Sequence, residues 1–257
     1  MRQAEQQPVR FVTVSTQRSG STWLTDLLNS HPDIASYTEL LLLQGRGIPD
    51  WGRYKDMTYW QTWREDLRGT ARYVRPLGLF RYLDEALSRH ADRQAVGLKL
   101  MYSQIVHFPE TLLYLRRRQV RIIHLVRRNV LDVVLSGLAK SSRKVAHAQA
   151  GASVEQVRLQ VDTAWLLRQL SRRWRDQRWF GRLLPRLGVP CAELVYEDIV
   201  AEPARLDDCV RFLGCAPAPL GSGLTKLNPR SHADLIGNLE EVQATLRGTP
   251  FAGMLRV

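Results

Sequence analysis

The sequence is poor in three features that would place it in other classes of protein. It has only three cysteines, Cys191, Cys209 and Cys215, whose spacing fits neither a disulfide framework nor a metal site. No apolar run approaches the ~18 residues that a membrane-spanning helix needs. The first ten residues lack the apolar core of a secretory signal. We therefore expect unpaired buried thiols, no transmembrane segment and a cytoplasmic location.

Acidic residues are also scarce. The chain has 25 Asp and Glu against 37 Lys and Arg, a formal net charge of +12. This excess favours an anionic partner, such as a phosphorylated cofactor, an acidic acceptor, a nucleic acid or an anionic membrane surface. The basic residues are scattered, and no RNA-binding or helix-turn-helix pattern accompanies them. We therefore expect no nucleic-acid partner, and a non-enzymatic polyanion binder stands as one alternative.

Apolar runs alternate with helical patterns along the chain. Strands are predicted over residues 10–16, 34–37, 95–101, 120–126 and 191–196. Helices are predicted over residues 21–29, 77–90, 103–118, 129–140, 153–178 and 203–213, and another begins near residue 233. This alternation predicts an α/β fold, a single P-loop-like domain over residues 1–257 with a mainly parallel central sheet and helices on both faces.

Residues 44–76 have a different texture, because glycines and a proline are mixed with tryptophans and tyrosines at irregular spacing. Such spacing is a poor match to a core helix. We interpret the segment as a lid or acceptor-site insertion in the domain. A surface subdomain packed by its own aromatic side chains is the alternative.

The first candidate site is the loop that follows the first predicted strand. Gly20 lets the backbone approach a phosphate closely, and Ser19, Ser21 and Thr22 add hydroxyl donors. The N-terminus of the next helix adds free N–H groups and the positive end of its dipole. Arg18 precedes the small residues, where its guanidinium can bridge a phosphate and a group in transfer. A P-loop-type kinase or NTPase is the second alternative, but the loop lacks the Gly-Lys-Ser/Thr ending that such an enzyme would have.

A second candidate anion site follows the apolar strand over residues 120–126. The sequence there reads RNVLDVVLS, from Arg128 to Ser136. Arg128 stands at the carboxyl end of the strand, and Ser136 lies two turns into the predicted helix. Both can hold a second, separate phosphate. Two anion sites on neighbouring strand–helix units predict a cofactor that bears phosphates at both ends.

The motifs TQRSGSTWL and RNxxDVxxS resemble those of the sulfotransferases that use 3′-phosphoadenosine 5′-phosphosulfate (PAPS). Tyr196-Glu197-Asp198, followed by a helix that ends before Gly214, resembles the last landmark of the family. The resemblance implies that Arg18 stabilises the bridging oxygen and the sulfuryl group, and that Ser19 to Thr22 cradle the phosphosulfate. It also implies that Arg128 and Ser136 bind the 3′-phosphate.

The resemblance suggests further contacts to the cofactor. Trp23 falls where an aromatic ring stacks on adenine, although a core tryptophan would fit the same helical pattern. Tyr196 is either an adenosine contact or a structural phenol. Lys226 and Arg230 belong to a C-terminal basic stretch that often closes over the 3′-phosphate in the family, and a basic surface turn is the alternative.

The general base is where this chain departs from the cytosolic members of the family. Those members carry Lys-x-His, whereas this chain has Met101 two residues after Lys99, and a thioether accepts no proton at neutral pH. Glu39 resembles the catalytic glutamate of tyrosylprotein and bacterial trehalose-type sulfotransferases, and LKLMYSQ is similar to the bacterial trehalose and Nod-factor group. We predict Glu39 as the base, with His107 as the fallback, and Lys99 as a residue that balances charge at the sulfate.

These residues predict sulfuryl transfer from PAPS to a hydroxyl group by in-line displacement, without a metal ion. PAP is then the second product. The bacterial-type resemblance favours a carbohydrate, glycolipid or small-molecule acceptor over a protein tyrosine. A homodimer is expected only from the family.

Overall fold

The computed structural model describes residues 7–147, 158–223 and 231–256. The chain forms two compact units. The first comprises Met1–Val126 and Trp179–Leu224, and the second comprises Arg127–Arg178 and Thr225–Val257. Within the described stretches, we find no helix with the length and apolar character needed to cross a membrane. Lys226 and Arg230 lie outside the described residues.

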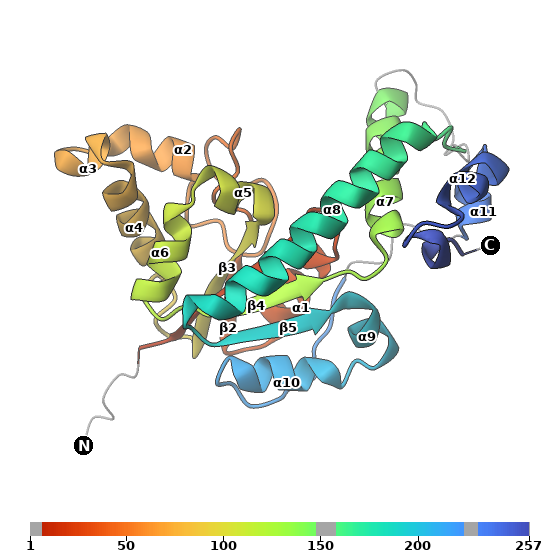
Figure 1. Cartoon of the computed structure of the whole chain (residues 1–257). Coiled ribbons are helices and arrows are strands. Elements are labelled where there is room, and N and C mark those ends of the chain that lie inside the picture. Colours follow the sequence, from red (N-terminus) through yellow and green to blue (C-terminus); the bar gives the residue numbers. More distant parts are fainter. Residues whose placement is uncertain (1–6, 148–157, 224–230, 257) are drawn as a thin grey trace. The chain divides into compact units, whose positions relative to one another are not determined.

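A five-stranded parallel sheet forms the centre of the first unit (Figure 1). Its strands are β1 (Val9–Ser15), β2 (Ile34–Tyr37), β3 (Ala95–Met101), β4 (Arg121–Val126) and β5 (Cys191–Val195). They follow the order β2-β3-β1-β4-β5, and every neighbouring pair is parallel. Each strand matches its predicted range to within one residue at either end. The predicted α/β fold with a parallel sheet is therefore confirmed.

The order of the strands marks where a ligand is expected to bind. The chain leaves β1 toward β2 on one side of the sheet, and leaves β4 toward β5 on the other side. The direction of winding therefore changes between β1 and β4. In open parallel sheets, ligands bind outside the carboxyl ends of the strands at such a switch point. The loop after β1 lies at this switch point, and it is the loop that the sequence analysis predicts as the first anion site.

Helices cover both faces of the sheet (Figure 1). One face packs against α4 (Arg75–Ala86), α5 (Tyr102–His107) and α6 (Glu110–Arg117), and the other against α1 (Ser21–Ser30), α9 (Tyr196–Ala201) and α10 (Arg205–Phe212). Side chains alternate between the faces, as in any strand. Val12 belongs to the first core and Phe11 to the second. Ile122 and Ile123 of β4 divide in the same way, as predicted for a strand buried on both faces.

The segment over residues 44–76 forms three short helical stretches, α2 (Trp60–Trp63), η1 (Arg64–Asp66) and α3 (Thr70–Tyr73). Trp60 is buried and packs against Trp63 and against Tyr82 of α4. Trp60 and Tyr82 both belong to the first core of the sheet. Part of the aromatic content of this segment is therefore shared with the main core, and its interpretation as a lid or acceptor-site insertion stays a prediction.

Four predicted helices are wrong in their bounds. The helix predicted over residues 77–90 ends at Ala86 of α4, and the helix predicted over residues 129–140 continues to His147, as α7 (Val130–His147). The helix predicted over residues 103–118 is divided into α5 and α6 at Phe108 and Pro109, because proline lacks the N–H that a continuous helix requires. Helix α8 (Thr163–Leu183) begins well after residue 153. Val161 is not helical, and its N–H donates to Oδ1 of Asn238 at 2.9 Å. The capping pattern at Ser153 lies outside the described residues.

The described part of the second unit is mainly helical. It contains α7 (Val130–His147), the first part of α8, α11 (His232–Leu235), α12 (Leu239–Leu246) and η3 (Ala252–Met254). Its apolar core joins Leu131 and Leu135 of α7 to Leu166 of α8 and Val242 of α12. A parallel bridge pairs Leu159 with Ile236. The C-terminal residues are thus packed into this unit rather than trailing from it.

The three cysteines are free thiols, as predicted. Cys209 and Cys215 are buried and Cys191 is half-buried. Burial raises the pKa of Cys209 to about 12 and those of Cys191 and Cys215 to about 11. Because the thiolate is the nucleophilic form, none of the three suits covalent catalysis at neutral pH.

Gly97 tests how tightly the sheet is packed. A Cβ atom at this position would lie 2.5 Å from the ring of Phe11, which is fully buried. We expect Gly97→Ala to lower the free energy of unfolding by about 1–3 kcal/mol, measured by urea denaturation. Gly137 in α7 is the matched control, because nothing lies within 4 Å of its added Cβ. Gly137→Ala should stabilise by about 0.5–1 kcal/mol. Equal effects of the two substitutions would contradict this packing.

His124 of β4 gives the fold a pH dependence. Its Nε2 lies 2.6 Å from the Tyr102 hydroxyl, and burial lowers the pKa of His124 to about 4. Below the ordinary histidine pKa of about 6.5, His124 is therefore protonated in the unfolded chain but stays neutral in the folded chain until the pH approaches 4. This contribution to stability is complete above about pH 6.5 and is lost as the pH falls to about 4.

We expect wild type to lose about 3 kcal/mol more than His124→Gln between about pH 7 and pH 4, measured by urea denaturation. The comparison with His124→Gln removes the titration of all other groups, which the two chains share. Parallel losses of stability in the two chains would show that His124 is not buried in the neutral form.

Candidate functional site

The loop between β1 and α1 has a backbone that depends on glycine. Gly20 has φ +93°, in the left-handed region, and a Cβ atom there would lie 2.5 Å from the ring of Tyr196. Arg18 also has a positive φ of 67°. Ser19 is buried, and its hydroxyl donates to the Thr16 carbonyl at 2.8 Å, which closes the turn. The predicted loop is therefore formed, and two left-handed residues alternate with a buried serine.

This loop has the composition of an anion cradle. Helix α1 begins at Ser21, and its first N–H groups have no partner within the helix. Gly20 is the N-cap and provides no side-chain cap, and α1, which is described throughout, has no acidic residue in its first turn. An anion is favoured at such a helix end by the N–H groups and by the helix dipole. The residues present therefore fit the phosphosulfate group that the resemblance implies.

Trp23 and Tyr196 form an aromatic pair beside the loop. Their ring centroids are 5.6 Å apart, in an edge-to-face arrangement. Tyr196 is the first residue of α9 and directly follows β5, so its ring reaches the loop from another strand. The structure thus brings Gly20, Trp23 and Tyr196 together, and their place in one binding site stays a prediction. Both rings remain half-buried.

A buried lysine joins the loop to the predicted base. Nζ of Lys99 lies 3.2 Å from Oε1 of Glu39 and donates to Oγ1 of Thr22 at 3.2 Å. The Lys99 side chain is 1% exposed, whereas that of Glu39 is 19% exposed. Three elements therefore converge here, because Thr22 belongs to α1, Glu39 follows β2 and Lys99 lies in β3. All three were predicted from the sequence as site residues, but the contacts between them were not predicted.

The electrostatics of Lys99 follow from its depth. Burial lowers the pKa of Lys99, the Glu39 carboxylate opposes this shift, and the positive charge of Arg18 adds to it. An ammonium group at this depth is stable only with an opposite charge and hydrogen-bond acceptors close by. Glu39 supplies the charge and one acceptor, and Thr22 supplies another.

Two residues of the site were missed by the sequence analysis. Gln104 of α5 donates from Nε2 to Oε2 of Glu39 at 3.3 Å, and its Oε1 accepts from the N–H of Met101 at 2.9 Å. Nζ of Lys99 lies 4.3 Å from the ring centroid of Trp51. Gln104 closes the LKLMYSQ motif, so a signal for it was present. Trp51 could not be singled out among the seven tryptophans of the chain.

Met101 and His107 occupy positions that differ from that of Glu39. Met101 is fully buried, and Oγ of Ser15 donates to its sulfur at 3.9 Å. Its side chain is therefore part of the core. His107 lies exposed at the last position of α5, with its ring 4.7 Å from that of Phe108. Glu39, in contrast, already has the ammonium and amide partners that orient a carboxylate.

Arg128 and Ser136 belong to the second unit. Arg128 is exposed just before α7, and Ser136 is half-buried within this helix. The residue between Arg128 and α7 is Asn129, whose Oδ1 accepts from the N–H of Asp132 at 3.1 Å and so caps the first turn. The local structure is the strand–loop–helix that the sequence predicted around this motif.

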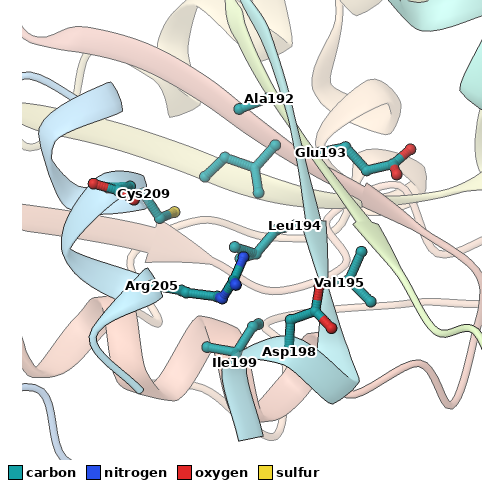
Figure 2. A pocket seen from close by; sticks show the side chains of 10 residues that line it. Ala192, Glu193, Leu194, Val195, Asp198, Ile199, Arg205 and Cys209 are labelled. Atoms are coloured by element: carbon teal, nitrogen blue, oxygen red, sulfur yellow. The ribbon is translucent and has the colours of Figure 1, made fainter. Parts of the chain in front are cut away.

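A pocket of about 180 Å³ lies at the edge strand β5, and its lining includes Asp198 of the Tyr196-Glu197-Asp198 segment (Figure 2). Asp198 of α9 and Arg205 of α10 line it together with apolar side chains such as Ile199. In Figure 2 the Arg205 side chain extends toward Leu194 of β5. The pocket also contains Glu193 and Asp208, but among the described residues no group of His, Cys, Asp or Glu is arranged to hold a metal ion.

Comparison with solved structures gives distant likenesses to sulfotransferases. The crystal structure of a sulfotransferase from Alicyclobacillus acidocaldarius is 19% identical, with 97% of this chain and 93% of that chain covered and a TM-score of 0.48. The sulfotransferase domain from the curacin biosynthetic pathway is 16% identical, with 97% and 83% covered and a TM-score of 0.46. A mouse sulfotransferase complexed with PAP is 15% identical, with 84% and 62% covered and a TM-score of 0.39.

These likenesses are too distant to support an argument about this chain. A comparison with curated proteins gives no match. The model described as "Sulfotransferase family" matches residues 10–216, which is most of the sequence and includes both predicted anion motifs and the Tyr196 segment. The chain therefore belongs to the sulfotransferase family.

Proposed function

We propose that this enzyme transfers the sulfuryl group of PAPS to a hydroxyl of a carbohydrate, glycolipid or small-molecule acceptor. The observation that supports this most strongly is the pair of contacts made by Lys99, to Glu39 and to Thr22 of the loop. A proton acceptor thereby lies one side chain away from an anion cradle. Transfer of a sulfuryl group to a hydroxyl requires both.

The loop residues bind and stabilise the donor end. PAPS, when bound, supplies an activated sulfuryl group attached to a phosphate. The N–H groups at the start of α1 and the hydroxyls of Ser21 and Thr22 are suited to hold the phosphosulfate. Arg18 stabilises the negative charge that develops on the leaving phosphate. Lys99 adds a second cation, in contact with Thr22.

Glu39 is the proposed general base. Lys99 contacts Oε1 and Gln104 donates to Oε2, so the two partners fix the plane of the carboxylate. Each oxygen still has a lone pair that can accept the proton of the acceptor hydroxyl. PAPS, when bound, would supply the sulfuryl group that the oxygen of this hydroxyl receives, and the bond between sulfur and the phosphate oxygen of PAP would break as Glu39 takes the proton. Orientation of the base before the reaction lowers the entropic part of the barrier.

The remaining cofactor contacts are proposed from the resemblance. Arg128 and Ser136 bind the 3′-phosphate, and Lys226 and Arg230 assist there. Trp23 and Tyr196 are proposed to contact the adenosine, and their edge-to-face pairing beside Gly20 supports this role.

Trp51 supports the proposed class of acceptor. Its ring covers Nζ of Lys99 and is still 36% exposed. Gly52 follows it, and a Cβ atom on Gly52 would lie 2.3 Å from Thr38, the residue before Glu39. The indole is therefore held close to the base. An exposed indole face suits the C–H face of a sugar or another flat apolar group.

A kinase-like function is the second candidate, because a β-strand, an anion loop and a helix also occur in P-loop enzymes. The lysine at this site comes from β3 rather than from the loop itself. Calorimetric titration separates the two functions. We expect PAP to bind at least about tenfold more tightly than ATP, and the reverse order would favour the kinase reading.

Glu39→Gln tests the base. The amide retains an acceptor for Lys99 but cannot take a proton, so turnover should fall below about 10% of wild type while PAP affinity persists. Thermal unfolding should show a lower midpoint, because Lys99 loses its opposite charge. Glu202→Gln, which changes a 61% exposed glutamate just after α9, is the control and should retain full turnover. If Glu39→Gln keeps more than about 10% of turnover, the base is another residue.

Trp51→Ala tests the acceptor platform. We expect the KM for the acceptor to rise roughly fivefold to tenfold, because the stacking surface is lost, while the affinity for PAP stays unchanged. Steady-state kinetics with the acceptor varied at saturating PAPS measures the change. Trp179→Ala removes an indole that is 54% exposed and packs on Phe180 instead, and it should leave this KM unchanged. An unchanged KM in Trp51→Ala would remove Trp51 from the acceptor site.

A further inference from the structure

The RNxxDVxxS motif contains two polar residues that the proposed function does not use, Asn129 and Asp132. In the second unit, both are bonded to the C-terminal segment. Oδ1 of Asp132 lies 2.8 Å from Nε2 of His232, and Oδ2 accepts from Nη2 of Arg127 at 2.8 Å. Nδ2 of Asn129 donates to the carbonyl of Met254 at 2.8 Å. The start of α7 is therefore fastened to the C-terminal segment at two points.

The geometry of His232 shows which way the proton points. The ring Nδ1 of His232 accepts from the backbone N–H of Arg256 at 2.9 Å. The backbone N–H of His232 donates to the Arg256 carbonyl at 3.1 Å. Since Nδ1 is an acceptor, Nε2 carries the hydrogen and donates to Asp132. His232 is buried, so water does not compete strongly for this bond. The contact is specific in direction and in tautomer.

Asp132 is charged at neutral pH. Burial raises the pKa of Asp132, but the His232 hydrogen bond and the Arg127 guanidinium outweigh this effect and lower the pKa to about 2. Both carboxylate oxygens thus have a strong donor. Hydrogen bonds to a charged group are roughly twice as strong as those between neutral groups.

We propose that the Asp132–His232 pair is a positioning device for Arg128, and that the C-terminal segment thereby sets the affinity for the 3′-phosphate. Arg128 stands between Arg127, whose side chain Asp132 holds, and Asn129, which caps α7 and holds Met254. Its backbone is therefore fixed from both sides. This inference rests on the proposed function, in which Arg128 and Ser136 bind the 3′-phosphate.

The test compares two nucleotides that differ only in the 3′-phosphate, PAP and AMP, by calorimetry on the full chain. We expect His232→Ala to weaken PAP binding by about tenfold and AMP binding by less than about twofold. Arg128 would no longer be held in position to contact the 3′-phosphate, which only PAP carries. His232→Gln can still donate a hydrogen bond to Asp132 and should recover part of the PAP affinity. Asp132→Asn loses the charge and provides a second, independent variant if His232→Ala does not fold.

Asn238→Ala is the matched control. Asn238 also joins the C-terminal segment to the rest of this unit, through two hydrogen bonds of 2.9 Å to the backbone of Val161. Its side-chain hydrogen bonds are made to Val161 and to Glu241 of α12 rather than to the start of α7, so its loss should destabilise the unit without changing the ratio of PAP to AMP affinity. If His232 had a purely structural role, His232→Ala and Asn238→Ala would have the same effect on the ratio of PAP to AMP affinity.

The outcomes separate the two proposals. If wild type binds PAP no better than AMP, the proposed 3′-phosphate site fails. If wild type prefers PAP and His232→Ala and Asp132→Asn keep that preference, or Asn238→Ala loses it equally, the positioning role of the Asp132–His232 pair is wrong. A loss of preference confined to the Asp132 and His232 variants supports it.

Discussion

The buried ammonium group of Lys99 is the constraint on which the candidate active site depends. A charge at this depth requires an opposite charge and acceptors in fixed positions, since an unpaired buried ion is strongly destabilising. Glu39 and Thr22 meet this requirement, and each belongs to a different element. The pairing that stabilises the lysine therefore also sets the position of Glu39, the proposed base, relative to the proposed anion loop. The stability of the fold and the geometry of the proposed active site depend on the same contacts.

The surrounding fold explains why these elements can converge. In a parallel sheet, the carboxyl ends of all strands lie at one edge, so residues after β1 and β2 meet the end of β3. Lys99 reaches this edge from inside β3, two residues before the strand ends. Tyr196 reaches the same loop from the end of β5, where its ring leaves space only for glycine at position 20. The site is thus assembled from strand ends rather than from one contiguous motif.

The parts that could be predicted from sequence are those with a local signal. The strands, the glycine loop, Glu39 and the motif from Arg128 to Ser136 can each be recognised from a short contiguous stretch of sequence. Contacts across long stretches were not predicted. Gln104 and Glu39 are 65 positions apart, and His232 and Asp132 are 100 apart. A single sequence holds no record of such pairs. The break at Pro109, in contrast, had a local cause that the helical pattern of residues 103–118 obscured.

Transfer of labelled sulfate from PAPS tests the central claim most directly. The purified full chain is incubated with PAPS labelled in its sulfuryl group and a panel of carbohydrate, glycolipid and small-molecule alcohols, and products are identified by mass spectrometry. We expect a sulfate ester on at least one hydroxyl acceptor, formed in equal amount with PAP and without added metal. Failure of every acceptor to gain sulfate, together with phosphoryl transfer from ATP to the same panel, would contradict it.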